Sequence, residues 1–200
     1  MSSILLSILI PTVVGREEQF KLLYARLSYQ YQGSEVEIFH IKDDKEITIG
    51  EKREMLYKGA NGLFSWQIDD DDSIAPNAIE LILNAIRSNP DVDVISFEEY
   101  VNMDGVEYKS NHSNDYHDWE GDGNSLFPDG FHFHRTIFFK DVIRTELAKS
   151  VPVPKLRWAE DHEWAKLLKP LIKSDHHIQK QIYRYIHISS NPEERYGLNK

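Results

Sequence analysis

The chain has 200 residues, of which 40% are hydrophobic, so it is long enough to bury the core of one domain. It has 33 acidic and 23 basic residues and a formal net charge of −10, which argues against a surface built to bind the backbone of a nucleic acid. Cysteine is absent, which excludes disulfides and thiolate metal sites, and we expect a cytoplasmic protein.

An apolar run covers residues 4–10 and ends at Pro11. The run is too short to cross a membrane, and it has neither a basic flank nor a small-residue cleavage signature, so we expect no integral membrane segment. A nearly continuous apolar run is typical of a parallel strand that is covered on both faces. The sequence therefore predicts a buried first strand that stops at Pro11.

Helix and strand patterns alternate through the rest of the first half. Apolar residues at three-to-four spacing predict a helix over 16–31, and a second helix is predicted over 50–60 with Met55 and Leu56 facing the core. The other predicted elements of this half are, in chain order, strands at 36–41, 63–68 and 92–97, with a helix between the last two that starts near Pro76 and ends before Asn89. This alternation predicts right-handed crossovers and an open α/β sheet.

The second half of the chain begins with a polar segment. Residues 102–130 are rich in Asn, Asp, His and Gly and carry little periodicity, so we predict long loops there. The elements predicted after it are, in chain order, strands at 131–134 and 136–139, a short helix at 142–149, an extended spacer at 151–154, a helix at 160–168 that Pro170 ends or kinks, and a strand at 182–188.

Four adjacent aspartates, Asp69 to Asp72, directly follow the predicted strand at 63–68. The first predicted strand ends at Pro11-Thr12 and the second at Asp43-Asp44. A bend, an acid pair and the acid run are therefore expected at the same edge of the sheet. Ligands of open α/β sheets bind beyond the carboxyl ends of the strands, and carboxylate oxygens there favour a divalent cation that meets a phosphate. The alternative is a solvated acidic turn before the helix near Pro76.

Four stretches of the chain form a pattern when they are taken in order: Ser7-Ile8-Leu9-Ile10-Pro11-Thr12, Gly50-Glu51-Lys52-Arg53, Gln67-Ile68-Asp69-Asp70-Asp71-Asp72 and Ala159-Glu160-Asp161-His162-Glu163-Trp164. In order and rough spacing this pattern resembles the family 2 glycosyltransferases of the GT-A fold. The resemblance implies an α/β, Rossmann-like, mixed but mainly parallel sheet flanked by helices. It also implies one domain over 1–200, with a nucleotide-sugar-binding half at 1–100 and an acceptor-binding half at 101–200.

The same resemblance implies a reaction and roles for individual residues. A sugar would pass with inversion from a nucleotide-diphosphate sugar to a hydroxyl of a glycan or another acceptor, with Asp161 as the general base. Asp71 would hold Mn²⁺ or Mg²⁺, which neutralises the leaving diphosphate, and His187 would be a further metal ligand. The donor-binding residues that it implies are Pro11, Thr12, Arg16, Asp43, Asp44, Arg53, Asp69 and Asp70. On the acceptor side we expect Trp158, Glu160 and His134.

Two stretches depart from the family pattern. The family often has Tyr-Asn after the first strand and commonly has Asp-Asp-Gly-Ser after the second, whereas this chain has Thr12-Val13 and Asp43-Asp44-Lys45-Glu46 at these places. The nucleobase therefore stays open. A solvated helix arginine is the alternative for Arg53, and a packed strand histidine is the alternative for His187.

Two other functions stay open on the sequence alone. A nucleotidyltransferase acting on sugar phosphates shares the sheet and the need for a metal, but it wants a glycine-rich loop that residues 13–16 do not supply. A non-catalytic module that binds a cation or a sugar would use the acid run and would have no need of Asp161. Substitution of Asp161 by Asn separates an enzyme from such a module.

Overall fold

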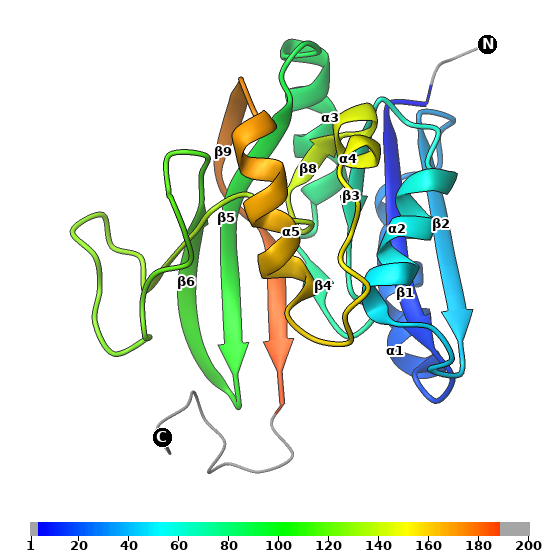
Figure 1. Ribbon diagram of the computed structural model, residues 1–200, viewed down its shortest axis with the longest axis horizontal. Helices are drawn as coiled ribbons and strands as arrows, with labels where there is room; N and C mark the ends of the chain where they lie inside the picture. The colour runs from blue at the N-terminus through cyan, green and yellow to red at the C-terminus, as the bar shows by residue number, and fades with distance from the viewer. Residues whose placement is uncertain (1–3, 189–200) are drawn as a thin grey trace.

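The computed structural model describes residues 4–188, which form a mixed α/β fold (Figure 1). The strands are β1 (Leu6–Val13), β2 (Val36–Asp43), β3 (Phe64–Gln67), β4 (Ser73–Ile74), β5 (Val94–Met103), β6 (Val106–His112), β7 (Phe133–Arg135), β8 (Val142–Arg144) and β9 (Asp175–His187). The helices are α1 (Glu17–Gln30), α2 (Ile49–Gly59), α3 (Ala78–Ser88), α4 (Thr145–Ser150) and α5 (Glu160–Leu168), followed by the 3-10 turn η1 (Lys169–Leu171).

All these strands belong to one mixed sheet. Its order is β2-β1-β3-β8-β5-β6-β7, and β9 pairs with β4 and β5. The strands β2, β1 and β3 are parallel neighbours, and β9 runs parallel to β5, whereas β8 is antiparallel to both β3 and β5. The predicted α/β fold with a mixed sheet between helices is confirmed.

Alternate residues of the strands supply two separate cores. Leu6 and Ile8 of β1 pack with α1 and α3 on one face of the sheet. Leu9, on the opposite side of the same strand, packs in a second core with residues of α2, α4 and α5. Figure 1 looks onto the face that α2, α4 and α5 cover. Burial on both faces explains why the first apolar run is nearly continuous.

The first strand extends beyond its predicted end at Pro11 and continues to Val13. The neighbouring β3 ends at Gln67, and the last bond to it is donated by the Ile68 amide to the Leu9 carbonyl at 3.0 Å. Because residues two apart in a strand present their backbone groups to the same side, Pro11 faces the side on which β3 has ended. The missing amide of proline therefore costs no ladder bond, and the strand continues by pairing with β2.

Helix α2 buries charged side chains on the face that packs against the sheet. Lys52 and Arg53 are 2% and 4% exposed, and Leu56 is fully buried as predicted. Met55 is 48% exposed, so the prediction that it faces the core is wrong. Arg53 is not the solvated helix arginine that was one alternative. A hydrophobic pattern assigns charged residues to the solvent, and it therefore misplaces a helix face that buries ion pairs.

The polar segment at 102–130 is shorter as a loop than predicted. Strand β5 runs on to Met103, and β6 begins after the turn at Asp104 and Gly105, whose φ angles are 51° and 86°. Two residues with positive φ make the tight hairpin turn whose twist matches antiparallel strands. Residues 113–130 carry no helix or strand, as predicted for this part, and the strand predicted at 131–134 begins at Phe133.

Three further elements differ from the predictions. Residues 136–139 are buried but form no strand, and a turn follows because the Asp141 side chain and amide bond the amide and carbonyl of Phe138. The helix predicted at 142–149 begins only at Thr145, since residues 142–144 form β8 between β3 and β5. The last strand begins at Asp175 instead of Ile182, since its polar first part pairs with β5. Within residues 4–188, none of the helices combines the length and apolarity that a membrane span requires.

Candidate active site

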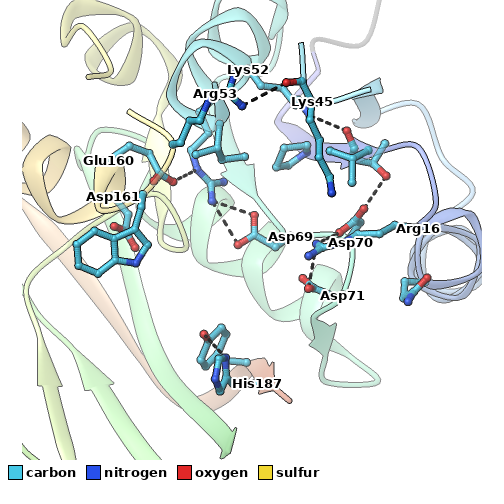
Figure 2. Close-up of a pocket in the computed structure, with 18 of the residues that line it drawn as sticks. Arg16, Lys45, Lys52, Arg53, Asp69, Asp70, Asp71, Glu160, Asp161 and His187 are labelled. Atoms are coloured by element: carbon cyan, nitrogen blue, oxygen red, sulfur yellow. Dashed lines mark hydrogen bonds and ion pairs between the residues drawn. The ribbon is translucent and has the colours of Figure 1, made fainter. Parts of the chain in front are cut away.

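A cavity of about 1240 Å³ opens where β1 and β3 end (Figure 2). Its walls come from the turn after β1, the acid run after β3, the end of β9 and the first turn of α5. The predicted site residues that line it are Pro11, Thr12, Arg16, Arg53, Asp69, Asp70, Asp71, Trp158, Glu160, Asp161 and His187. In Figure 2, Asp161 and Arg16 lie at opposite sides of the pocket, with the aspartates between them.

Asp70 connects the acid run to the end of β1. It is 2% exposed and accepts hydrogen bonds from Thr12 Oγ1 at 2.6 Å and Arg16 Nη1 at 2.8 Å. A buried carboxylate without such partners would carry a large desolvation penalty. Asp70 therefore fixes the two strand ends relative to each other.

Arg53 connects three parts of the cavity wall. Its Nε donates to Glu160 at 2.9 Å, its Nη1 to Gln67 at 3.1 Å, and its Nη2 lies 3.0 Å from Asp69. The guanidinium also lies over the ring of Phe139, 3.4 Å from the centroid. Burial alone would lower the pKa of Arg53, but Asp69 and Glu160 outweigh it and raise that pKa, so the group is charged. Glu160 and Asp69 are thereby held at fixed positions around one cation.

Asp71 is the aspartate of the run that is best placed to meet a ligand. Its side chain is 40% exposed, and one carboxylate oxygen lies 2.9 Å from Arg16 Nη1. Burial raises the pKa of Asp71 above its ordinary value, and the positive charge of Arg16 opposes this rise. The Asp71 carboxylate is therefore accessible to a ligand in the cavity, and Arg16 fixes its orientation.

Asp72 is the only one of the four aspartates that does not line the cavity. It accepts hydrogen bonds from the Tyr183 hydroxyl at 2.6 Å and the Ile186 amide at 2.8 Å, and it lies 3.9 Å from Lys140 Nζ. Burial raises the pKa of Asp72 to about 8, although the charge of Lys140 acts in the opposite direction. Asp72 therefore anchors β9 to the acid run.

Asp161 lies in the first turn of α5, where the predicted helix begins. Its Oδ1 accepts the amide of His162 at 2.8 Å. The preceding Ala159 has φ 62°, a left-handed conformation that turns the chain sharply into the helix, and Trp158 before it is 85% exposed. His162 also lines the cavity, with its Nε2 2.7 Å from Asp118 Oδ1. A carboxylate, an imidazole and an open indole thus share one wall.

No protein-family model and no curated protein matches the chain. Among solved structures, residues 1–349 of S. aureus TarS in complex with UDP match with a TM-score of 0.64 and 17% identity, over 91% of this chain and 60% of that one. The same fragment in complex with UDP-GlcNAc matches with a TM-score of 0.63 and 15% identity, over 94% and 60%. S. aureus TarS matches with a TM-score of 0.63 and 17% identity, over 91% and 36%.

TarS is a glycosyltransferase, and at these identities the likeness is one of fold. The chain has the GT-A fold. It spans 60% of the 1–349 fragment of TarS and 36% of the longer TarS structure.

Three predicted residues lie outside the cavity walls of this GT-A fold. Asp43 forms an ion pair with Lys52, and its Oδ2 accepts the Ile47 amide at 3.2 Å. Asp44 is exposed and does not line the cavity. His134 is stacked between Tyr116 and Phe127, with ring centroids 4.1 and 3.9 Å away, and it bonds Asp129 at 2.9 Å. These neighbours hold His134 of β7 against the loop that precedes the strand, outside the cavity walls.

The donor atoms near the acid run suit a hard cation that is shared with a ligand. Among residues 4–188, no three His, Cys, Asp or Glu side chains gather closely enough to hold a metal by themselves. His187 lines the cavity at the end of β9, where its Nδ1 lies 3.5 Å from the Tyr185 hydroxyl. Mg²⁺ is usually bound by one or two carboxylates together with substrate phosphates, so the accessible oxygens of Asp71 fit a cation held in that way.

Two buried lysines contribute to this site without having been predicted. Lys52 Nζ donates to the Thr12 carbonyl at 2.7 Å and pairs with Asp43, which joins α2 to the ends of β1 and β2. Lys140 Nζ lies 2.9 Å from Glu99 and beside Asp72. The local signals are that Lys52 stands beside Arg53 on α2 and nine residues after Asp43, whereas Thr12 and Glu99 are distant in sequence from the lysines that they bind.

Proposed function

We propose that the protein transfers a sugar from a nucleotide-diphosphate sugar to a hydroxyl of a glycan or another acceptor, with inversion at the anomeric carbon. The observation that carries the proposal is that Asp71 and Asp161, from opposite halves of the chain, line the same cavity. The GT-A fold, shared with TarS structures that hold UDP and UDP-GlcNAc, supports it. Uridine diphosphate sugars are therefore the first donors to test.

Asp161 is the general base in this proposal. Its carboxylate takes the proton of the acceptor hydroxyl, the oxygen attacks the anomeric carbon, and the bond from that carbon to the diphosphate oxygen breaks on the opposite face. The amino end of α5 favours the ionised form of Asp161 through the helix dipole. The exposed indole of Trp158 supplies a flat apolar surface on which an acceptor sugar stacks.

The donor lies over the acid run in this proposal, against residues 1–100, and the acceptor lies against residues 101–200. Asp71, with His187 across the cavity, would hold Mn²⁺ or Mg²⁺ together with the donor diphosphate. Such a cation supplies positive charge where the leaving nucleoside diphosphate gathers negative charge. Arg16 orients the Asp71 carboxylate, and Arg53 holds Asp69 on the same wall.

The variant Asp161→Asn tests this function. The amide keeps the shape of the side chain and cannot take the proton, so we expect transfer to fall by about a hundredfold or more while UDP affinity is unchanged. Transfer is measured as UDP released from UDP-sugars in the presence of candidate acceptors, and affinity is measured by calorimetry. Glu163→Gln is the matched control, since Glu163 lies two residues further on α5 and pairs with Lys166 on the surface.

Three outcomes of this experiment oppose the proposal. If Asp161→Asn transferred sugar at the full rate, Asp161 would not be the general base. Loss of UDP affinity together with transfer would make Asp161 a binding residue. Nucleotide binding without transfer in the unaltered protein, for every donor and acceptor tested, would favour a non-catalytic binding module.

A further inference from the structure

Two cationic side chains of the cavity form no close ion pair with a carboxylate of the described residues. The cavity is lined by five cationic residues, which are Arg16, Lys45, Lys52, Arg53 and Arg157. Arg16, Lys52 and Arg53 form ion pairs with aspartates or with a glutamate. Within residues 4–188, no carboxylate forms an ion pair with Lys45 or Arg157, so these two charges are available to an anionic ligand.

The fold brings these two residues together from distant parts of the chain. Lys45 lies in the loop between β2 and α2, and Arg157 lies in the segment before α5. Arg157 Nη1 donates a hydrogen bond to the Lys45 carbonyl at 3.2 Å, which holds the guanidinium beside the lysine backbone. In Figure 2 the Lys45 side chain extends into the pocket toward the row of aspartates. The two groups therefore form one cationic edge of the cavity.

The backbone at Lys45 adopts a conformation that is unfavourable for a residue with a Cβ. Its φ is 60°, in the left-handed region that glycine adopts readily and a residue with a Cβ does not. Such outliers persist where the surrounding structure determines them, and they gather at ligand clamps and active sites. Within the described residues, the Lys45 ammonium makes no hydrogen bond, so no contact inside the protein accounts for a lysine at this position.

We infer that Lys45 and Arg157 bind the diphosphate of a nucleoside diphosphate at this cationic edge of the cavity, an inference that rests on the proposed function. A diphosphate placed beside Asp69, Asp70 and Asp71 is repelled by three carboxylates. The nearby cations, Arg16 and Arg53, already form ion pairs with these carboxylates. Two unpaired cations offset this repulsion, and hydrogen bonds from charged donors to phosphate oxygens are among the strong ones. Arg157 supplies a planar donor pair and Lys45 a mobile point charge.

The variants Lys45→Gly and Arg157→Gln test the inference in the full chain. Glycine suits the positive φ, so Lys45→Gly should keep the melting temperature while it removes the charge. We expect each variant to bind UDP and inorganic pyrophosphate about tenfold more weakly than the unaltered protein, with uridine affinity unchanged, in calorimetric titrations. Lys155→Gln is the control, because Lys155 is close in sequence and pairs with Glu51 outside the cavity; it should leave all three affinities unchanged.

The possible results separate this inference from the proposed function. Unchanged pyrophosphate and UDP affinities in both variants would overturn the clamp, whatever the transfer activity. An equal loss for uridine would also overturn it, because the residues would then contact the nucleoside. A weakening that appears only toward a negatively charged acceptor would assign the two cations to the acceptor and overturn the diphosphate assignment. Phosphate binding that depends on both residues, in a protein that transfers no sugar, would keep the clamp and overturn the transferase.

Discussion

A row of buried charges starts at the acid run and leads away from the cavity. Lys140 lies between Asp72 at 3.9 Å and Glu99 at 2.9 Å, and His112 lies between Glu99 at 3.2 Å and Asp141 at 3.1 Å. Each cation has an acid on both sides, so no charge in the row is left unpaired. Removing one member would leave its neighbours as unpaired charges in a medium of low polarity, which is strongly destabilising. The position of Asp72 therefore depends on the whole row.

This row makes the stability of the protein depend on pH. Burial alone would lower the pKa of His112, but Asp141 and Glu99 outweigh it and raise the pKa from 6.5 to about 9. A raised pKa means that the stabilising effect of the charged imidazole is complete below about pH 6.5 and is lost as the pH rises through 9. We expect up to about 3 kcal/mol of unfolding free energy to be lost over this window.

Denaturant unfolding of the unaltered protein and of His112→Gln at about pH 6 and about pH 9.5 measures the effect. The stability difference between the two proteins should be larger at the lower pH. The exposed His117→Gln is a matched control that should show no such dependence. A difference of the same size at both pH values would contradict the assignment of a charged imidazole to the row.

The candidate site was predictable where a residue stands at an end of a regular element. Asp71 follows a strand and Asp161 opens a helix, and both line the cavity. The partners of the buried cations were not predictable in this way. Arg53 and Glu160 are 107 residues apart in sequence, and only the folded sheet places Glu160 against α2. The exposure of Asp44 likewise depends on which way the loop after β2 turns.

At the scale of elements, α2 positions the segment that carries Arg157 and Trp158. The helix begins with a capping box in which Thr48 and Glu51 bond each other's amides. Gly50 then donates its amide to the Leu156 carbonyl at 3.2 Å. A Cβ on Gly50 would lie 1.8 Å from the Pro154 carbonyl oxygen, so only glycine allows the segment to approach so closely.

The variant Gly50→Ala should therefore push the segment at 154–158 away from α2. Overpacking against backbone that cannot rotate away costs about 1–3 kcal/mol of unfolding free energy, even though alanine favours helices. We expect UDP affinity to fall as well, since Arg157 moves with the segment. Denaturant unfolding and calorimetry measure both effects.

The exposed Met55→Ala, on the same helix, is the control for helix propensity and should leave stability within about 0.5 kcal/mol. Gly50→Ala with unchanged stability would show that the segment adapts at no cost.

Periodic elements were predicted well, and elements determined by tertiary contacts were not. The helices α1, α2, α3 and α5 lie within a few residues of their predicted ranges, because each presents a regular face to the sheet. The first part of β9, from Asp175, was missed because its side chains are mostly polar, and its strand conformation comes from pairing with β5. Residues 136–139 were predicted as a strand because most of them are apolar, although Asp141 imposes a turn from Phe138 onward.

At the scale of the whole molecule, a chain of net charge −10 lines its cavity with five cationic and five acidic residues. An anionic nucleotide together with a divalent cation suits such a mixed lining. A ligand that binds only the folded chain stabilises it, by about 2.7 kcal/mol at a hundred times its Kd, which corresponds to roughly 5–10 °C for a chain of this size. We expect UDP with Mn²⁺ to raise the melting temperature by about this amount, and UDP with a chelator to raise it much less.

The variant Asp71→Asn should abolish the part of this shift that depends on Mn²⁺. Glu80→Gln on the exposed side of α3 is the control and should retain it. Thermal unfolding monitored by circular dichroism gives the measurement. Equal shifts with Mn²⁺ and with the chelator would contradict the proposed metal dependence.

The anchoring of Arg53 has a consequence for protein engineering. Its guanidinium binds Gln67, Asp69 and Glu160 at once and lies flat on Phe139, a combination that the single ammonium of a lysine does not reproduce. Trp158, by contrast, is 85% exposed and tolerates replacement without repacking. Mutant libraries that seek a new substrate preference should therefore diversify Trp158 itself and leave Arg53 constant.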